Sequence, residues 1–317
     1  MYPWRYLSLL LLTLVSGLAL LGCGGSPRGG AVATPTPARS PAKPTAPIIQ
    51  HLKDAGYDCG HALTGTPVSL WRCSQLLPSN VDVEVNLQEQ KGSLVGALGV
   101  IAGVMGSMDV GAGRQDVLPV MVDLMPLAVD GRLGEQGAAW VRSSKANDAT
   151  RIGDVISLQS KAVTGTATFS LLIRPFESQQ STGDEEMPGT QDALVQWFQK
   201  YGATCKPSAS SSSKLDCAAS DHALYGSIEK GPKGGLKRIY AHLAKGSPDL
   251  FKGPLNELVA AGVQDQAAVK ELQEWIPRRL DGRTHRFSTN GLDISLGPET
   301  AGGTREAIMS ITPTTYY

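Results

Sequence analysis

The sequence has no excess of charge of either sign. Its 29 lysine and arginine residues are balanced by 29 aspartate and glutamate residues. A chain without net positive charge has no overall electrostatic field that attracts nucleic acid. We therefore expect no nucleic-acid partner.

Several short motifs of common enzyme classes are also missing. The sequence contains no Gly-x-Ser-x-Gly, no His-Glu-x-x-His, no P-loop, and no Gly-x-Gly-x-x-Gly between a strand and a helix. Cys-x-x-Cys, the usual redox pair, is absent as well. We therefore assign no catalytic residue, no cofactor and no metal site, and interpret the protein as non-catalytic. An extracytoplasmic enzyme with an unrecognised active site is the alternative.

Long apolar runs are scarce. The leucine-rich stretch 6–22 and the uncharged stretch 92–108 are each 17 residues long, whereas a membrane-spanning helix needs about 20 apolar residues. The second stretch has the Gly-x-x-x-Gly spacing of membrane helices, but it contains five glycines. We predict a buried strand that leads into a glycine-rich turn.

The N-terminus has the pattern of a secretory signal peptide. Arg5 precedes the apolar stretch 6–22, which ends in Leu20-Leu21-Gly22-Cys23. This ending resembles the lipobox of bacterial lipoproteins, although Leu21 stands where that family more often has a smaller or β-branched residue. The resemblance implies removal of residues 1–22 and lipidation of Cys23. It places the protein outside the cytoplasm, held by its N-terminal lipid to an outer membrane or cell surface.

Residues 23–47 have the composition of a tether. Six prolines and almost no bulky apolar side chain follow Cys23, so this segment cannot bury enough surface to fold. Where it adopts polyproline II geometry, it reaches roughly 3 Å per residue. We expect it to hold a folded body away from the membrane.

The folded body contains an internal duplication. Residues 48–59 (IIQHLKDAGYDC) match 194–205 (LVQWFQKYGATC), with apolar residues on one helical face, then a glycine and a cysteine. SLWRCS at 69–74 matches SKLDCA at 213–218, and 153–175 parallels 291–313. We predict two repeat units, 48–176 and 190–317, joined by the acidic linker 177–189. Each unit is expected to run helix, three strands, two helices, two strands.

The duplication predicts a role for each of the five cysteines. Cys23 is the lipidation site, and the other four fall as one pair per unit at equivalent positions. In an oxidising compartment such pairs form disulfides, so we predict Cys59–Cys73 and Cys205–Cys217, each linking the helix exit to the first strand. His61 has no counterpart in the second unit, which disfavours a zinc site or a nucleophile with its base.

The expected fold class is α+β. Two tandem duplicated units each form an antiparallel sheet, with helices packed on one face and one disulfide. The first 40 or so residues of each unit resemble the disulfide-clipped, helix-on-sheet repeats of the β-lactamase inhibitory protein. The additional helical stretch departs from that pattern, so an inhibitor role is not carried over.

Two local features suggest partners. Residues 278–286 (RRLDGRTHR) contain Arg278, Arg279, Arg283 and Arg286, a candidate patch for an anionic partner such as a phosphate-bearing envelope polymer. Another candidate partner is an envelope protein. A cluster of methionines is typical either of core packing or of Cu(I) binding. It comprises Met105, Met108, Met121 and Met125. We expect Trp71, Trp140, Trp197 and Trp275 to pack the helices on the sheets. An exposed contact is the alternative for Trp197, which lies off the main apolar stripe of its helix.

Overall fold

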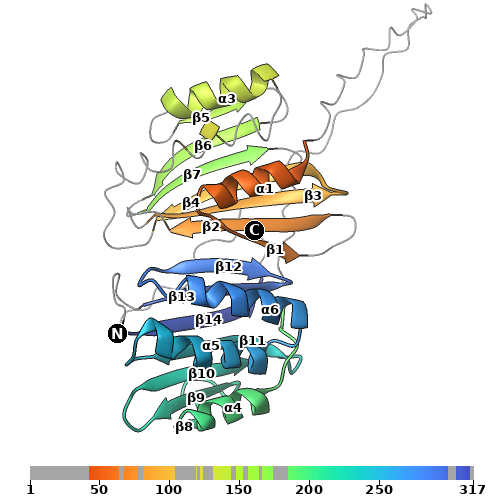
Figure 1. Cartoon of the computed structure of the whole chain (residues 1–317). Coiled ribbons are helices and arrows are strands. Elements are labelled where there is room, and N and C mark those ends of the chain that lie inside the picture. The colour runs from red at the N-terminus through yellow and green to blue at the C-terminus, as the bar shows by residue number, and fades with distance from the viewer. Residues whose placement is uncertain are drawn as a thin grey trace, which may run out of the picture. The chain divides into compact units, whose positions relative to one another are not determined.

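A computed structural model of the chain has the mixed α+β architecture shown in Figure 1. It describes residues 43–63, 68–76, 81–103, 119, 122–123, 131–143, 148–152, 156–163, 166–173, 185–298 and 305–314. Ser40–Tyr317 forms one compact unit. The signal sequence, Cys23, the four clustered methionines and most of the acidic linker lie outside the described residues, so the predictions made for them stay predictions.

The strands that the structure describes belong to two antiparallel sheets. The first sheet has the order β1-β2-β3-β4-β7-β6-β5. Its strands are β1 (Asp58–Leu63), β2 (Ser69–Leu76), β3 (Val81–Gln90), β4 (Ser93–Gly103), β5 (Ala149–Ile152), β6 (Ile156–Val163) and β7 (Thr166–Ile173). The second sheet has the order β8-β9-β10-β11-β14-β13-β12. Its strands are β8 (Ala203–Pro207), β9 (Lys214–Ala219), β10 (Leu224–Lys230), β11 (Leu236–Leu243), β12 (His285–Thr289), β13 (Leu292–Gly297) and β14 (Ala307–Pro313).

The two sheets have the same internal order. When the strands of each are counted along the chain from one to seven, both read 1-2-3-4-7-6-5. Each sheet therefore consists of a four-stranded meander whose last strand pairs with the last strand of a three-stranded meander. Sequence reasoning missed the first strand of both meanders in each sheet, namely β1, β5, β8 and β12. These strands are six, four, five and five residues long, which is too short for alternation to identify a strand.

Ser93–Gly103 forms strand β4, which confirms the strand predicted within 92–108, whereas the turn predicted after it lies outside the described residues. β4 pairs with β3 on one side and β7 on the other, so the glycine-rich stretch lies inside the first sheet. Among the described residues, no helix combines the length and the apolar character needed to cross a membrane.

A short amphipathic helix precedes each sheet. These helices are α1 (Thr45–Asp54) and α4 (Gln191–Lys200), and their apolar residues are buried as predicted. Gly56 and Gly202 follow them with φ of +91° and +81°. This left-handed conformation ends a helix at low cost only for glycine, and it confirms the predicted helix stops.

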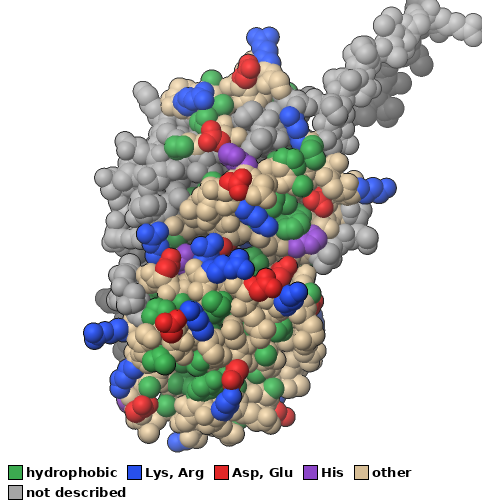
Figure 2. All heavy atoms as spheres, in the orientation of Figure 1, with side chains coloured by type: hydrophobic (Ala, Val, Ile, Leu, Met, Phe, Trp, Pro, Cys, Tyr) green, Lys and Arg blue, Asp and Glu red, His purple; other side chains and the backbone are tan. Residues whose placement is uncertain are grey.

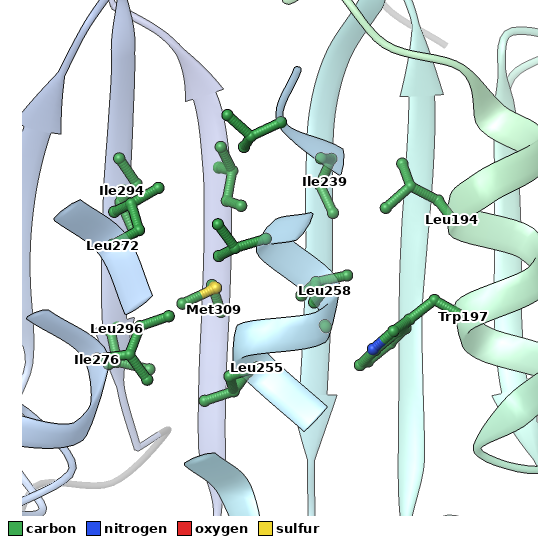
Figure 3. Close-up of a cluster of buried hydrophobic side chains, with 14 of the residues drawn as sticks. Leu194, Trp197, Ile239, Leu255, Leu258, Leu272, Ile276, Ile294, Leu296 and Met309 are labelled. Atoms are coloured by element: carbon green, nitrogen blue, oxygen red, sulfur yellow. The ribbon is translucent and has the colours of Figure 1, made fainter. Parts of the chain in front are cut away.

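Three further helical elements cover the second sheet. They are α5 (Pro248–Gly262), α6 (Gln266–Trp275) and the 3₁₀ turn η1 (Ile276–Arg278). Figure 1 shows α4, α5 and α6 on the same face of this sheet, and Figure 3 shows the apolar side chains between them. In the first half, α3 (Gly131–Ser143) precedes β5.

Trp197 is packed in the core of the second half, as expected, and the alternative that it is an exposed contact is wrong. Its side chain is 4% exposed, and its indole Nε1 donates a hydrogen bond to the carbonyl oxygen of Pro254 at 2.9 Å. The cause is tertiary, because α5 packs beside α4 and covers a position that the apolar stripe of α4 alone leaves at its edge.

The structure contains the two predicted disulfides, Cys59–Cys73 and Cys205–Cys217. Each joins directly opposed residues on the first two strands of its sheet. The sequence expectation was a link between the helix exit and the first strand. The link instead lies between two paired strands, since the first cysteine of each pair is itself in a strand. Disulfides of this kind indicate an oxidising, extracytoplasmic compartment.

Candidate functional site

The most elaborate polar region of the described structure lies where the two sheets meet. β12 of the second sheet contacts both β1 and β2 of the first. Figure 2 shows acidic, basic and histidine side chains gathered in a band across the middle of the molecule, at the level of β1 and β12 in Figure 1. We call the contact between β12 and the β1–β2 pair the junction.

Strand alternation decides which side chains enter the junction. The sulfur of Cys59 lies 4.0 Å from the backbone oxygen of Ile49 on α1, so the disulfide is on the helix-covered face of the first sheet. Asp58 and Gly60, the neighbours of Cys59 in β1, therefore belong to the other face. Their partners in β2, Ser74 and Arg72, share that face. That face meets β12.

Gly60 permits the close approach of the two sheets. A β-carbon at this position would lie 1.8 Å from the backbone oxygen of Ser288 and 2.9 Å from the ring of Phe287. Just beyond β12, the amides of Asn290 and Gly291 donate hydrogen bonds of 2.9 and 2.6 Å to the backbone oxygens of His61 and Ala62. The absence of a side chain at Gly60 therefore lets backbone meet backbone.

The first ionic cluster of the junction is centred on Arg72. This arginine is 5% exposed, and its Nη1 donates to the Asp293 carboxylate at 2.7 Å. Its Nε donates to Asn86 at 3.0 Å and lies 3.4 Å from the carboxylate of Glu84. Asp293 also accepts a hydrogen bond of 2.6 Å from the Ser288 hydroxyl. A buried charge requires such compensation, because removal from water is costly.

The second ionic cluster surrounds Asp58, which is 7% exposed. One of its carboxylate oxygens accepts hydrogen bonds from Nε and Nη2 of Arg279 at 3.0 and 2.6 Å. Its other oxygen lies 3.6 Å from Nδ1 of His285, whose Nε2 lies 2.8 Å from Asp281. One carboxylate of the first sheet is thus held by two basic groups of the second half.

The cluster changes the pKa of His285 and the pKa of Asp281. Burial alone would lower the pKa of His285, but its interactions with the Asp58 and Asp281 carboxylates raise that pKa above its ordinary value. Burial would raise the pKa of Asp281, but the neighbouring His285 and Arg283 lower it below its ordinary value. Both shifts favour the charged forms of His285 and Asp281.

The four arginines predicted as an anion patch have different environments. Arg279 is paired with Asp58 across the junction, whereas Arg278 is largely exposed and lies 3.9 Å from Glu274. Arg283 is exposed in the loop before β12, and Arg286 is exposed on β12, with its backbone oxygen accepting a hydrogen bond from Ser74. The structure therefore gives at least one of the four a structural role.

A shallow depression brings two of these arginines together. Arg279 and Arg283 line it with Glu306, and Phe251, Leu280 and several small residues supply apolar surface. Arg278 and Arg286 are not among the lining residues. A site with two guanidinium groups beside an apolar surface suits an anionic group attached to an apolar one.

The other sequence candidates are placed away from reactive chemistry. Cys59 is bonded to Cys73, which removes the free thiol that a nucleophile requires. His61 stacks on Trp71 with ring centroids 4.5 Å apart. Within the described part of the chain, no group of three or more His, Cys, Asp or Glu side chains is arranged to hold a metal ion.

A second group of connected polar side chains lies on the face of the second sheet that is opposite its helices. This group was not identified from the sequence. Nδ1 of His242 is hydrogen-bonded to the Tyr225 hydroxyl, and Nε2 lies 3.3 Å from the Glu306 carboxylate. His242 and Tyr225 are directly paired across β10 and β11. The sequence signal is the alternation of polar residues in these strands, but only the strand register identifies which of them meet.

The chain was compared with models of known protein families and with curated proteins, and neither comparison gave a match. The candidate site therefore consists of the junction and the depression beside it, and its function has to be argued from their chemistry.

Proposed function

We propose that this chain is a non-catalytic, lipid-anchored protein of the cell envelope that binds a partner through two duplicated units acting as one rigid body. The observation that carries the proposal is the junction, where charged side chains from both halves are paired with one another. Such pairing fixes the relative position of two sheets, as a shared binding surface requires.

Duplication is supported by more than the sequence match. Both sheets have the same strand order, both disulfides join the first two strands, and both leading helices stop at a left-handed glycine. The two copies differ at the junction positions. Lys206 corresponds to Gly60 and Asp216 to Arg72 by the cysteine alignment. We propose that the two units diverged at these positions, so that the β1–β2 pair of the first unit can form the junction and the corresponding β8–β9 pair of the second unit cannot.

Anchoring through Cys23 is proposed from the lipobox-like sequence and the proline-rich tether. The test is metabolic labelling of the full chain with radioactive palmitate, followed by fractionation of membranes. We expect the wild-type protein to carry label and sediment with membranes. The Cys23→Ala variant should carry no label. Equal labelling of both proteins would contradict the anchoring proposal.

For the partner, we propose an anionic envelope polymer that contacts Arg283 and the exposed arginines near it. The probe is soluble polyphosphate, with uncharged dextran as the negative control. Binding should weaken as salt is added, because each neutralised phosphate releases counterions. The double variant Arg278→Ala/Arg283→Ala should bind several-fold more weakly than wild type.

The matched control removes two exposed lysines from the same half, as Lys237→Ala/Lys270→Ala. It has the same net charge as the arginine variant, so a local patch predicts that it keeps most of the binding. Equal losses in both variants would refute a specific patch. A pull-down from the source envelope with a soluble fragment that starts at Ser40 would then identify a protein partner, the other candidate.

A further inference from the structure

The contact between Asp58 and His285 joins a buried carboxylate to an imidazole, a group that can gain or lose a proton. Asp58 comes from β1, and the groups that face it are Arg279, directly after η1, and His285 at the start of β12. A guanidinium group is charged at all ordinary pH values, whereas an unperturbed histidine titrates near pH 6.5. Of the two basic groups beside Asp58, the guanidinium therefore has a permanent positive charge, and the imidazole has a charge that depends on pH.

We propose that His285 is a pH-sensitive lock of the junction, which holds the two sheets together more tightly when its imidazole is protonated. The proposal rests on the position of the ring between two carboxylates, one from each side of the junction. Nε2 faces Asp281 of its own half at 2.8 Å, and Nδ1 faces Asp58 of the other sheet at 3.6 Å.

Proton counting explains the lock. A protonated imidazole has two N–H donors and can serve both carboxylates, whereas a neutral ring has one N–H and one lone pair. In the neutral ring, the remaining proton stays on Nε2, because Nε2 makes the shorter contact, to Asp281. Nδ1 then presents a lone pair to the buried carboxylate of Asp58. Deprotonation therefore breaks the interaction that crosses the junction and preserves the one within the second half.

The other charged groups around the ring do not replace the His285–Asp58 interaction. Arg279 already donates twice to the oxygen of Asp58 that is farther from His285. The backbone amide of Arg283 donates to Asp281 at 3.0 Å, and the guanidinium of Arg283 favours the charged form of that carboxylate. Arg286 follows in the same strand and lies on the opposite face of β12.

The direction of the pH effect follows from linkage. The interactions with Asp58 and Asp281 raise the pKa of His285 in the folded protein. A raised pKa contributes stability that is complete below the unfolded pKa and is lost as pH rises through the folded pKa. The junction is therefore tightest in mild acid and loosens toward alkaline pH.

The test measures hydrogen exchange of two reporter amides in the full chain with both disulfides intact. The amides of Asn290 and Gly291 donate across the junction to His61 and Ala62. Their protection factors, corrected for the intrinsic pH dependence of exchange, are compared at about pH 5 and about pH 8.5, on either side of the ordinary histidine pKa. We expect protection to fall about fivefold at the higher pH, the effect of one modest hydrogen bond.

Two variants separate the lock from general pH effects. His285→Gln is neutral at every pH, so its reporter amides should show the lower protection at both values. His222→Asn changes an exposed histidine in the β9–β10 turn, where the positive φ of 56° suits asparagine. This control should keep the full pH dependence of the wild type.

A variant-free measurement covers the case in which His285→Gln does not fold. NMR titration of the His285 ring in the wild type should give a pKa above the ordinary histidine value of about 6.5. The protection of Asn290 and Gly291 should change with the same midpoint as His285. Flat protection, a different midpoint, or an unchanged pH dependence in folded His285→Gln would each overturn the proposal.

Discussion

Gly60→Ala is the most direct perturbation of the junction. The new methyl group would lie 1.8 Å from the backbone oxygen of Ser288, whereas ordinary contact begins at 3.4 Å. β1 and β12 would have to separate by about 1.6 Å, the difference between these two distances. The obstacle is backbone on both sides, so no side-chain rotation relieves it.

The free energy that Gly60→Ala can cost is limited to the stability that the junction contributes, because the sheets can separate instead of bearing the strain. If the sheets stay together, the strain of overpacking costs about 1–3 kcal/mol. If they separate, the protein loses the backbone hydrogen bonds of Asn290 and Gly291, which contribute about 1 kcal/mol each. It also loses the Arg72–Asp293 and Arg279–Asp58 pairs, whose charges regain water. We expect a net loss of about 2–4 kcal/mol on this reasoning.

Calorimetry and hydrogen exchange would detect the change. Wild type should unfold in one cooperative transition, since the junction couples the two sheets. In Gly60→Ala, the transition should move to lower temperature or divide in two, and the amides of Asn290 and Gly291 should lose protection. Gly253→Ala is the control, because a methyl group there meets nothing within 4 Å inside α5. A Gly60→Ala protein with wild-type melting and wild-type protection would refute the close approach.

Three further predictions concern the charges, the crosslinks and the core. Arg72→Ala leaves Asp293 and Glu84 without their buried counter-ion and should destabilise the fold by about 3 kcal/mol. The exposed Lys200–Glu257 pair should matter less, so Lys200→Ala is expected to cost under about 1 kcal/mol in the same urea titration. Cys205→Ser/Cys217→Ser removes a crosslink that spans 12 residues and should lower the free energy of unfolding by about 3 kcal/mol. An unchanged urea midpoint under non-reducing conditions would argue against that crosslink. Trp197→Phe should cost about 1 kcal/mol through the lost hydrogen bond to Pro254, and Trp197→Ala about 3–5 kcal/mol through the cavity. Tolerance of alanine at this position would contradict the observed burial.

Local patterns predicted the parts of the fold that depend on neighbours in sequence. The spacing of Ile48, Ile49 and Leu52 identified α1, and Gly56 identified its end. Strand β3 followed from alternation in 81–88. The short strands β1 and β8 were missed because a strand is defined by its partner, and five or six residues carry too little pattern without that partner.

The candidate site was less predictable than the fold. Arginines at 278–286 were recognised as a basic segment, but the sequence does not indicate that Arg279 pairs with Asp58. The two residues are separated by 221 positions. Arg72 and Asp293 are separated by the same number. No periodicity of helix or strand extends over such a distance.

The sequence by itself determined the cysteine pairing, the helix stops and the α+β class. These features follow from composition and short-range spacing. Only the tertiary structure decided that Gly60 would meet the backbone of β12, and that Asp58, Arg279 and His285 would form one cluster. The reason is physical: strand register fixes which side chains share a face, but only packing of one sheet against the other determines what that face meets.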